Sequence, residues 1–243
     1  MDHETFLAHI VEQAEAMRQA VVAAGPSAPV PTCPEWTVKD LVGHMAVVHN
    51  MAGEALTRSI DDRPARATPP EDWTELLAWW DEQRTTLLAR LAAADPAKQV
   101  WGFVPELASA GWWARRQAHE TAIHRLDAEH ARLEKVPTLM FGSKFAADGI
   151  DEVLRMSEFR ARVKRPEVTV EGTVLLHAAD AGKAWVLHAE RGVVKYGPVE
   201  DSATHADANL VGTADAVYRA AWKRPSTAIA SGRVELLQAV HGG

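Results

Sequence analysis

The sequence predicts an α-helical bundle followed by a small α+β domain, and two features of the 243-residue chain lead to this expectation. Apolar residues recur at helical spacing in stretches up to about residue 163, and segments rich in proline and glycine separate these stretches. Beyond Pro166, short runs of β-branched and apolar residues replace the helical pattern. We therefore expect a helical domain over residues 1–160 and an α+β domain over residues 166–243.

The first predicted helix covers residues 4–24, and Gly25 with Pro26 ends it. The segment from Pro26 to Pro34 contains four prolines, so it is expected to be an extended connector. Thr37 then begins the second helix, and Asp40 follows three residues later, which is the spacing of a capping box. We therefore assign Asp40 to the helix start in preference to a role beside a bound ion.

The remaining helices of the bundle follow from the same periodicity. The third is predicted over residues 71–94, after a loop rich in proline and arginine and before the pair Asp95 and Pro96. The fourth covers residues 112–133. A fifth helical pattern, over residues 143–163, is expected to lead out of the bundle.

The α+β domain is predicted from strand-like segments that surround one short helix. The strand-like segments cover residues 168–176, 184–188, 193–196 and 209–211. Gly192 lies where a hairpin would join the second segment to the third. Thr213 is expected to open a helix that reaches Lys223, and residues 229–237 to form a last strand and a turn.

Charge and composition argue against several classes of partner. The net charge is −7 with a pI near 5.9, and the basic residues are scattered, so nucleic acid and anionic membranes are unfavourable partners. The single cysteine, Cys33, allows no internal disulfide and suits a reducing compartment. The chain shows neither a secretory signal nor a long apolar run. We therefore expect a cytoplasmic monomer or homodimer that acts on a small molecule.

Two histidines and a glutamate are candidate metal ligands. Glu120 and His124 are four residues apart in the fourth predicted helix and share one face. His44 lies inside an apolar run of the second predicted helix. If the two helices are neighbours, these side chains converge as a site with two histidines, one carboxylate and open coordination positions. His119, five residues before His124, should face elsewhere, so the zincin motif is absent.

Spacing alone does not identify a metal site. An acidic residue precedes a histidine by four positions in Asp40/His44, Glu120/His124 and Asp201/His205. Any of these pairs also fits a solvated ion pair on a helix surface, which contributes only a few tenths of a kcal/mol. His49, five residues after His44, is expected to be capped or exposed to solvent and not to bind an ion.

The segment CPEWTVKDLVGH, residues 33–44, followed about 75 residues later by His119, Glu120 and His124, resembles the mycothiol-dependent maleylpyruvate isomerase family. This family belongs to the DinB-like four-helix metalloproteins, and its members often carry a C-terminal domain similar to sterol carrier proteins. The pattern of residues 207–212 and 230–237 fits that domain. The resemblance thus implies a DinB-like four-helix bundle followed by a sterol-carrier-like α+β domain.

The resemblance also implies a chemistry. His44, Glu120 and His124 would bind a divalent ion, usually zinc, and the cofactor would be the thiol mycothiol. In the isomerase version the thiolate adds to a conjugated double bond of a small anionic substrate, rotation follows and the thiol leaves. In a transferase version the adduct is released instead.

Two arginines are candidates for the catalytic machinery. Arg116 lies four residues before Glu120 on the same helix face, so it could bind a substrate carboxylate. A salt bridge within the bundle fits its position equally well. The family resemblance implies that the second domain contributes a basic group, and Arg219, on the helix expected from Thr213, is the candidate.

Two other functions are compatible with the sequence. One is a DinB-like metal-dependent hydrolase that uses no thiol. The other is a non-catalytic binding protein, in which the sterol-carrier-like domain holds an apolar ligand. Dependence on a thiol would distinguish the thiol-dependent isomerase or transferase from the hydrolase. A metal-free preparation with an undisturbed fold would favour the binding protein.

Overall fold

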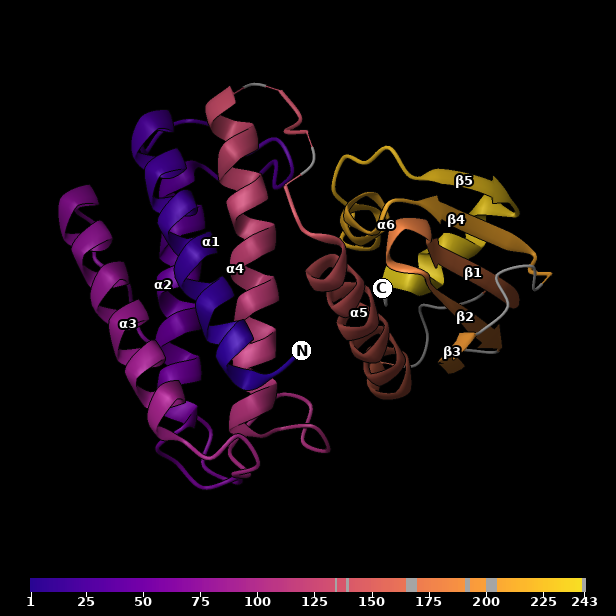
Figure 1. Ribbon diagram of the computed structural model, residues 1–243. Helices are drawn as coiled ribbons and strands as arrows, with labels where there is room; N and C mark the ends of the chain where they lie inside the picture. Colours follow the sequence, from indigo (N-terminus) through magenta and orange to yellow (C-terminus); the bar gives the residue numbers. More distant parts are fainter. Residues whose placement is uncertain (134, 139, 165–169, 191–192, 200–204, 242–243) are drawn as a thin grey trace. The chain divides into compact units, whose positions relative to one another are not determined.

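The computed structural model describes residues 1–133, 135–138, 140–164, 170–190, 193–199 and 205–241. The chain divides into two compact units, Met1–Pro137 and Thr138–Gly243. The first unit is helical, whereas the second combines helices with a five-stranded mixed sheet (Figure 1). The expected change from a helical part to an α+β part is therefore confirmed.

The described part of the first unit contains four long helices. They are α1 (His3–Ala24), α2 (Val38–Ala55), α3 (Trp73–Ala93) and α4 (Ala110–Leu133). Side chains of Asp2, Thr37 and Asp72 accept hydrogen bonds from backbone N–H groups in the first turns of α1, α2 and α3. The predicted starts and ends lie close to the observed ones, because these caps and the prolines between the helices are visible in the sequence.

The capping box at the start of α2 is present. The Thr37 hydroxyl accepts from the Asp40 N–H at 3.3 Å, and the Asp40 carboxylate accepts from the Thr37 N–H at 2.8 Å. Such a cap stabilises a helix by about 1 kcal/mol. It fixes where α2 begins, at Val38, six residues before His44.

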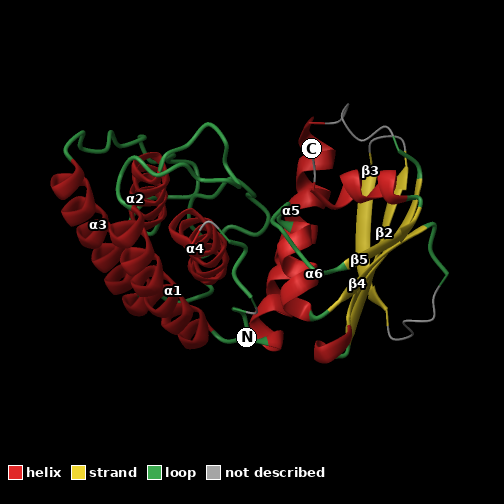
Figure 2. Ribbon diagram, turned by 90° about the horizontal axis from the view of Figure 1, so that it is seen from above, coloured by secondary structure: helices red, strands yellow, loops and turns green. Residues whose placement is uncertain are grey.

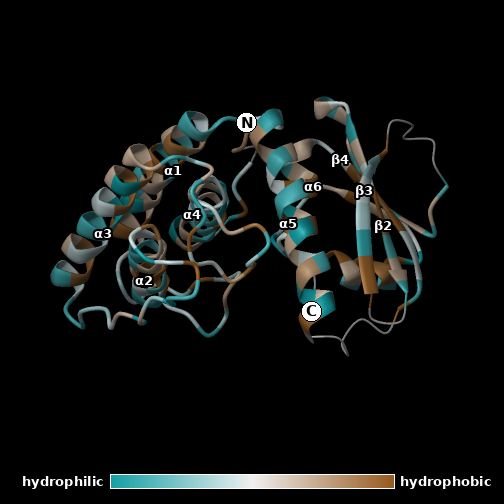
Figure 3. Ribbon diagram, turned by 90° about the horizontal axis from the view of Figure 1, so that it is seen from below, coloured by the Kyte–Doolittle hydropathy of each residue, from teal (hydrophilic) through white to brown (hydrophobic). Residues whose placement is uncertain are grey.

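The helices of the first unit pack around a shared apolar core. Each helix carries apolar and polar residues together, as Figure 3 shows by colour, and the apolar ones turn inward. Fully buried members of this core include Met17, Leu41, Met45, Leu76 and Trp80. The core therefore holds α1, α2 and α3 in fixed register, and Ala128 of α4 belongs to it as well.

His49 of α2 is fully buried, which corrects the expectation that it is capped or exposed. Trp80 of α3 donates its Nε1–H to His49 Nδ1 at 3.2 Å, and His49 Nε2 lies 3.2 Å from Thr121 Oγ1 of α4. Because Nδ1 accepts, the imidazole is neutral and carries its proton on Nε2. The sequence pattern missed this role because α2 packs against both α3 and α4 and so has no wholly exposed face at this level.

The second unit is a mixed sheet with helices on one face. Its elements are α5 (Ser143–Lys164), β1 (Gly172–Ala178), β2 (Lys183–Glu190), β3 (Val193–Val199), β4 (Ala208–Gly212), α6 (Ala214–Ala221) and β5 (Ile229–Gly232), with short 3₁₀ segments η1 (Ala179–Ala181) and η2 (Val234–His241). The strand order is β3-β2-β1-β4-β5, and only the β1–β4 pair is parallel. Helices α5 and α6 lie over the same face of this sheet (Figure 2).

The register of the sheet explains which strand residues are buried. Val174 and Leu176 of β1 pair with Leu187 and Trp185 of β2, and all four side chains are buried. They point to one face, because residues directly opposite each other in an antiparallel pair share a face. The strands predicted from the sequence are thus observed, although residues 168–169 of the first predicted segment lie outside the described residues.

The division between the units differs from the boundary expected near residue 165. It falls between Pro137 and Thr138, so α5 belongs to the second unit. Helix α5 packs against α6, β3 and η2. A helical hydrophobic pattern shows that a helix has a buried face, but it does not show which domain covers that face.

Among the described residues, no helix combines the length and the hydropathy needed to cross a membrane.

The pKa of His49 makes the stability of the first unit depend on pH. Burial lowers the pKa of this imidazole from 6.5 to about 3, and the charge of Arg84 acts in the same direction. Between these two values the unfolded chain binds a proton at His49 that the folded chain does not bind. The contribution of His49 is therefore fully present above about pH 6.5 and is lost as the pH falls toward 3.

We predict that His49→Gln removes this part of the pH dependence. From about pH 7 to about pH 5, the wild-type chain should lose about 2 kcal/mol of unfolding free energy through His49. Glutamine keeps one donor and one acceptor but does not titrate. Urea unfolding of both proteins at both pH values measures the two losses, and equal losses would show that His49 takes up its proton in the folded state.

Candidate metal centre

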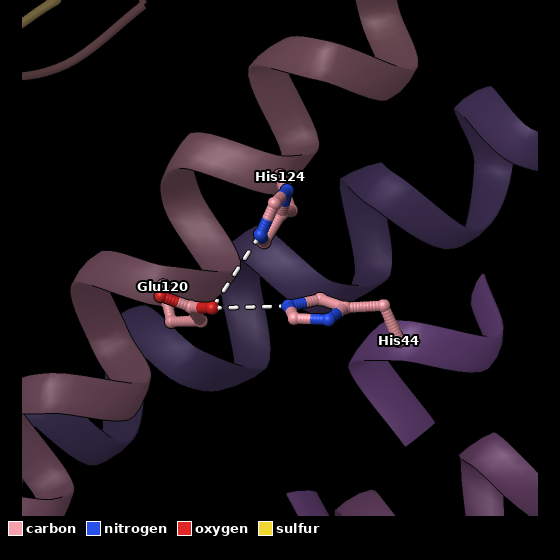
Figure 4. Close-up of side chains that lie close together, drawn as sticks. All are labelled: His44, Glu120 and His124. Atoms are coloured by element: carbon pink, nitrogen blue, oxygen red, sulfur yellow. Dashed lines mark hydrogen bonds and ion pairs between the residues drawn. The ribbon is translucent and has the colours of Figure 1, made fainter. Parts of the chain in front are cut away.

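Two neighbouring helices bring the three predicted ligands together. His44 lies on α2, whereas Glu120 and His124 lie one turn apart on α4, and the two helices pack against each other. Figure 4 shows all three side chains pointing to one place. Within the described residues, these three form the one cluster of histidine, cysteine or acidic side chains whose ligand atoms are close enough to hold a metal ion.

The distances between the ligand atoms fit a single small ion. Glu120 Oε1 lies 3.2 Å from His44 Nε2 and 3.4 Å from His124 Nε2, and the three atoms all lie within 4.8 Å of one another. Two atoms bound at about 2.0–2.1 Å to one tetrahedral zinc ion are about 3.3–3.4 Å apart. Two imidazole nitrogens and one carboxylate oxygen are also a usual zinc donor set. The residues present therefore fit a divalent ion of this kind.

The second oxygen of Glu120 is occupied by Arg116, one turn earlier on α4. Arg116 is buried, and its Nη2 lies 2.6 Å from Glu120 Oε2. Arg116 thus forms the salt bridge considered in the sequence analysis, and its part in binding a substrate carboxylate stays a prediction. The guanidinium binds Oε2 of Glu120, and the other oxygen, Oε1, faces the two histidines.

Glu120 is ionised at neutral pH despite its burial. Burial by itself would raise the pKa of this carboxyl group, but the charge of Arg116 and the hydrogen bonds to His124 and His44 hold the pKa well below its usual range. A carboxylate must be deprotonated to bind a metal ion. The surroundings of Glu120 thus prepare it for that role.

His124 contacts a second carboxylate through its other ring nitrogen. His124 Nδ1 lies 2.9 Å from Oδ2 of Asp127, which is fully buried. Burial alone would lower the pKa of His124, but the hydrogen bonds to Asp127 and Glu120 outweigh it and raise the pKa to about 9. Sequence reasoning did not select Asp127, although its position three residues after His124 placed it on the same helix face.

Trp36 covers the two imidazoles from the connector between α1 and α2. Its ring centroid lies 4.9 Å from that of His44 and 6.0 Å from that of His124, and the side chain is half-buried. The sequence reading included Trp36 only as part of the segment that resembles the family. Its contact with both histidines depends on the path of the connector, which no spacing rule shows.

Two other residues named in the sequence analysis, His119 and Arg219, have contacts of their own. His119 is fully buried and packs in a T-shaped arrangement with Phe6 of α1, at 6.2 Å between ring centroids, so it points away from the site as expected. Arg219 lies on α6 in the second unit and is buried there. Its Nε lies 2.8 Å from Asp215 Oδ2, and its Nη2 donates to the Thr138 carbonyl at 2.5 Å. The part of Arg219 in catalysis stays a prediction.

Comparison with known proteins agrees with the sequence resemblance. The family model described as the mycothiol maleylpyruvate isomerase N-terminal domain matches residues 7–129, which include all three candidate ligands. The crystal structure of the mycothiol-dependent maleylpyruvate isomerase matches with a TM-score of 0.62 and 13% identity, over 95% of this chain and 93% of that chain. At this identity the structural likeness establishes the fold. A sequence comparison with curated proteins gave no match.

We predict that His44→Ala lowers the zinc content of the purified chain by more than about tenfold, because it removes one of three protein ligands. Elemental analysis after dialysis measures this content. His119→Ala, which changes a histidine that points away from the cluster, is the matched control and should keep the wild-type content. Full zinc stoichiometry in His44→Ala would refute the ligand assignment.

Proposed function

We propose that this chain, which belongs to the mycothiol maleylpyruvate isomerase N-terminal domain family, is a metal-dependent enzyme that uses a low-molecular-weight thiol. His44, Glu120 and His124 would hold the divalent ion, for which zinc is our choice. The reaction would be isomerisation or S-transfer on a small anionic substrate. Mycothiol is the thiol that the family name indicates.

One observation carries the metal-dependent part of this proposal. Glu120 Oε1 lies at ligand-to-ligand distance from His44 Nε2 and His124 Nε2, at 3.2 and 3.4 Å. The atoms of these side chains that face away from the cluster also have partners. Arg116 contacts Oε2 of Glu120, and Asp127 contacts Nδ1 of His124. Ligand atoms that converge on one point, with outer hydrogen bonds on two of the three side chains, suit a metal site.

The thiol-dependent part rests on the family, because no residue of the cluster selects sulfur over water. Three protein ligands would leave a coordination position open. A zinc ion there would favour the thiolate form of a thiol, which is the nucleophilic form, at neutral pH. The chain itself would then need no reactive cysteine, and Cys33 lies in the connector with its Sγ 4.0 Å from Asp127 Oδ2.

The proposed isomerisation balances without an oxidant or a reductant. When bound, the thiol would supply a nucleophile that adds reversibly to one carbon of a conjugated double bond while the π electrons move into the adjoining carbonyl system, so that the former double bond could rotate before the thiol leaves again. In the transfer version, a proton would add to carbon and the thioether would leave.

Arg116 acts in this proposal through Glu120. Its guanidinium lies 2.6 Å from Glu120 Oε2, so it compensates the buried charge and orients the carboxylate. A substrate carboxylate at Arg116 would have to share the guanidinium with Glu120. The contact therefore supports the salt-bridge role over direct substrate binding.

The two roles of Arg116 can be separated by one substitution. We expect Arg116→Gln to weaken zinc binding by about tenfold, because Glu120 loses the partner that orients it. Competition with a colorimetric chelator measures the affinity. If zinc affinity is unchanged while KM for an anionic substrate rises, Arg116 binds substrate and the positioning role is wrong.

Thiol dependence is tested with the cobalt-substituted protein. Added mycothiol should produce a ligand-to-metal charge-transfer band in the near ultraviolet, because a thiolate would coordinate the ion directly. The metal-free protein and His44→Ala should give no such band. If the spectrum does not change and a hydrolytic substrate is turned over without thiol, the hydrolase function replaces the proposed one.

A further inference from the structure

Asp127 links the candidate metal centre to the connector between α1 and α2. This carboxylate is fully buried on α4, two turns after Glu120. Its Oδ2 lies 2.9 Å from His124 Nδ1, and its Oδ1 accepts from the Thr32 hydroxyl at 2.6 Å. The Cys33 thiol contacts Oδ2 at 4.0 Å. The Asp127 side chain therefore contacts both the candidate ligand His124 and the connector between α1 and α2.

The contact with His124 determines which ring nitrogen faces the cluster. A carboxylate can only accept, so His124 Nδ1 must carry the proton in this contact. Nε2 then points toward Glu120 Oε1, at 3.4 Å. A carboxylate behind a metal-bound histidine fixes the tautomer and the ring orientation, and it makes the ring a stronger donor.

The contact with Thr32 fixes the connector. Within this loop the Cys33 N–H donates to the Val30 carbonyl at 2.9 Å, and the Trp36 N–H donates to the Cys33 carbonyl at 2.8 Å. The loop is thus a compact turn, and Trp36 at its end covers the two imidazoles. Because Asp127 contacts both Thr32 and His124, it ties this turn to His124.

We infer that Asp127 is a positioning residue of the metal centre, which presents Nε2 of His124 to the ion and anchors the connector that covers the ligands. This inference rests on the proposed metal binding by His44, Glu120 and His124. It goes beyond that proposal because none of those ligands requires a buried carboxylate behind it.

The two contacts of Asp127 can be removed separately. Asp127→Asn keeps a side chain of the same shape but removes the negative charge behind His124 and changes both contacts. Thr32→Val removes only the hydroxyl that anchors the connector, so it is the matched control. If Asp127 served the loop alone, the two variants would behave alike.

The experiment measures zinc affinity of the full chain by chelator competition. Asp127→Asn should bind zinc roughly 10- to 100-fold more weakly than wild type. In Thr32→Val the loss of zinc affinity should be smaller than about threefold. The d–d absorption of the cobalt forms should shift in Asp127→Asn and stay unchanged in Thr32→Val. Equal zinc affinities in wild type and Asp127→Asn, or equal losses in both variants, would overturn the inference.

If Asp127→Asn does not fold, a measurement on the wild-type chain tests the role of Asp127. Long-range ¹H–¹⁵N spectra of the zinc-loaded protein should show His124 protonated at Nδ1 and bound to the metal through Nε2. A proton on Nε2 would contradict the inference. Failure of the wild-type chain to bind zinc at all would instead refute the proposed function, so the two failures are distinct.

Discussion

In the described structure of the first unit, two histidines contact one atom, Oε1 of Glu120, whose side chain is only 17% exposed. His44 reaches this oxygen from α2, and His124 reaches it from the next turn of α4. A buried carboxylate is costly unless charges and donors compensate it. Arg116 on the other oxygen supplies the compensating charge. The two helices must therefore keep a fixed register, because a shift of one turn would separate the donors by about 5 Å.

Several features of the bundle hold that register. The capping box of Thr37 and Asp40 sets the first turn of α2. One turn beyond His44, buried His49 bonds to Trp80 of α3 and to Thr121 of α4, and Thr121 is the neighbour of Glu120 along the chain. These hydrogen bonds lie in the core, where an unpaired polar group would be costly. The surroundings of the site are thus ordered by polar contacts as well as by apolar packing.

Much of the fold and the three candidate ligands could be predicted from the sequence. The helices are marked by caps and prolines, and Glu120 and His124 are local neighbours on one helix face. His44, which is distant along the chain, was selected as a histidine inside an apolar helical run, and the family resemblance supported it. By contrast, the burial of His49, the cover provided by Trp36 and the partners of Asp127 depend on contacts between separate elements. Periodicity carries no information on such contacts. For the same reason it does not show which unit covers the apolar face of α5, which was expected in the helical domain and lies in the second unit.

Zinc K-edge X-ray absorption of the purified chain tests whether His44, Glu120 and His124 bind the ion. We expect one ion per chain, with nitrogen and oxygen scatterers at about 2.0–2.1 Å and the outer-shell pattern of two imidazoles. Added mycothiol should introduce one sulfur scatterer at about 2.3 Å. A purified chain that binds no zinc, or a zinc ion surrounded only by oxygen with no imidazole pattern, would contradict the ligand assignment.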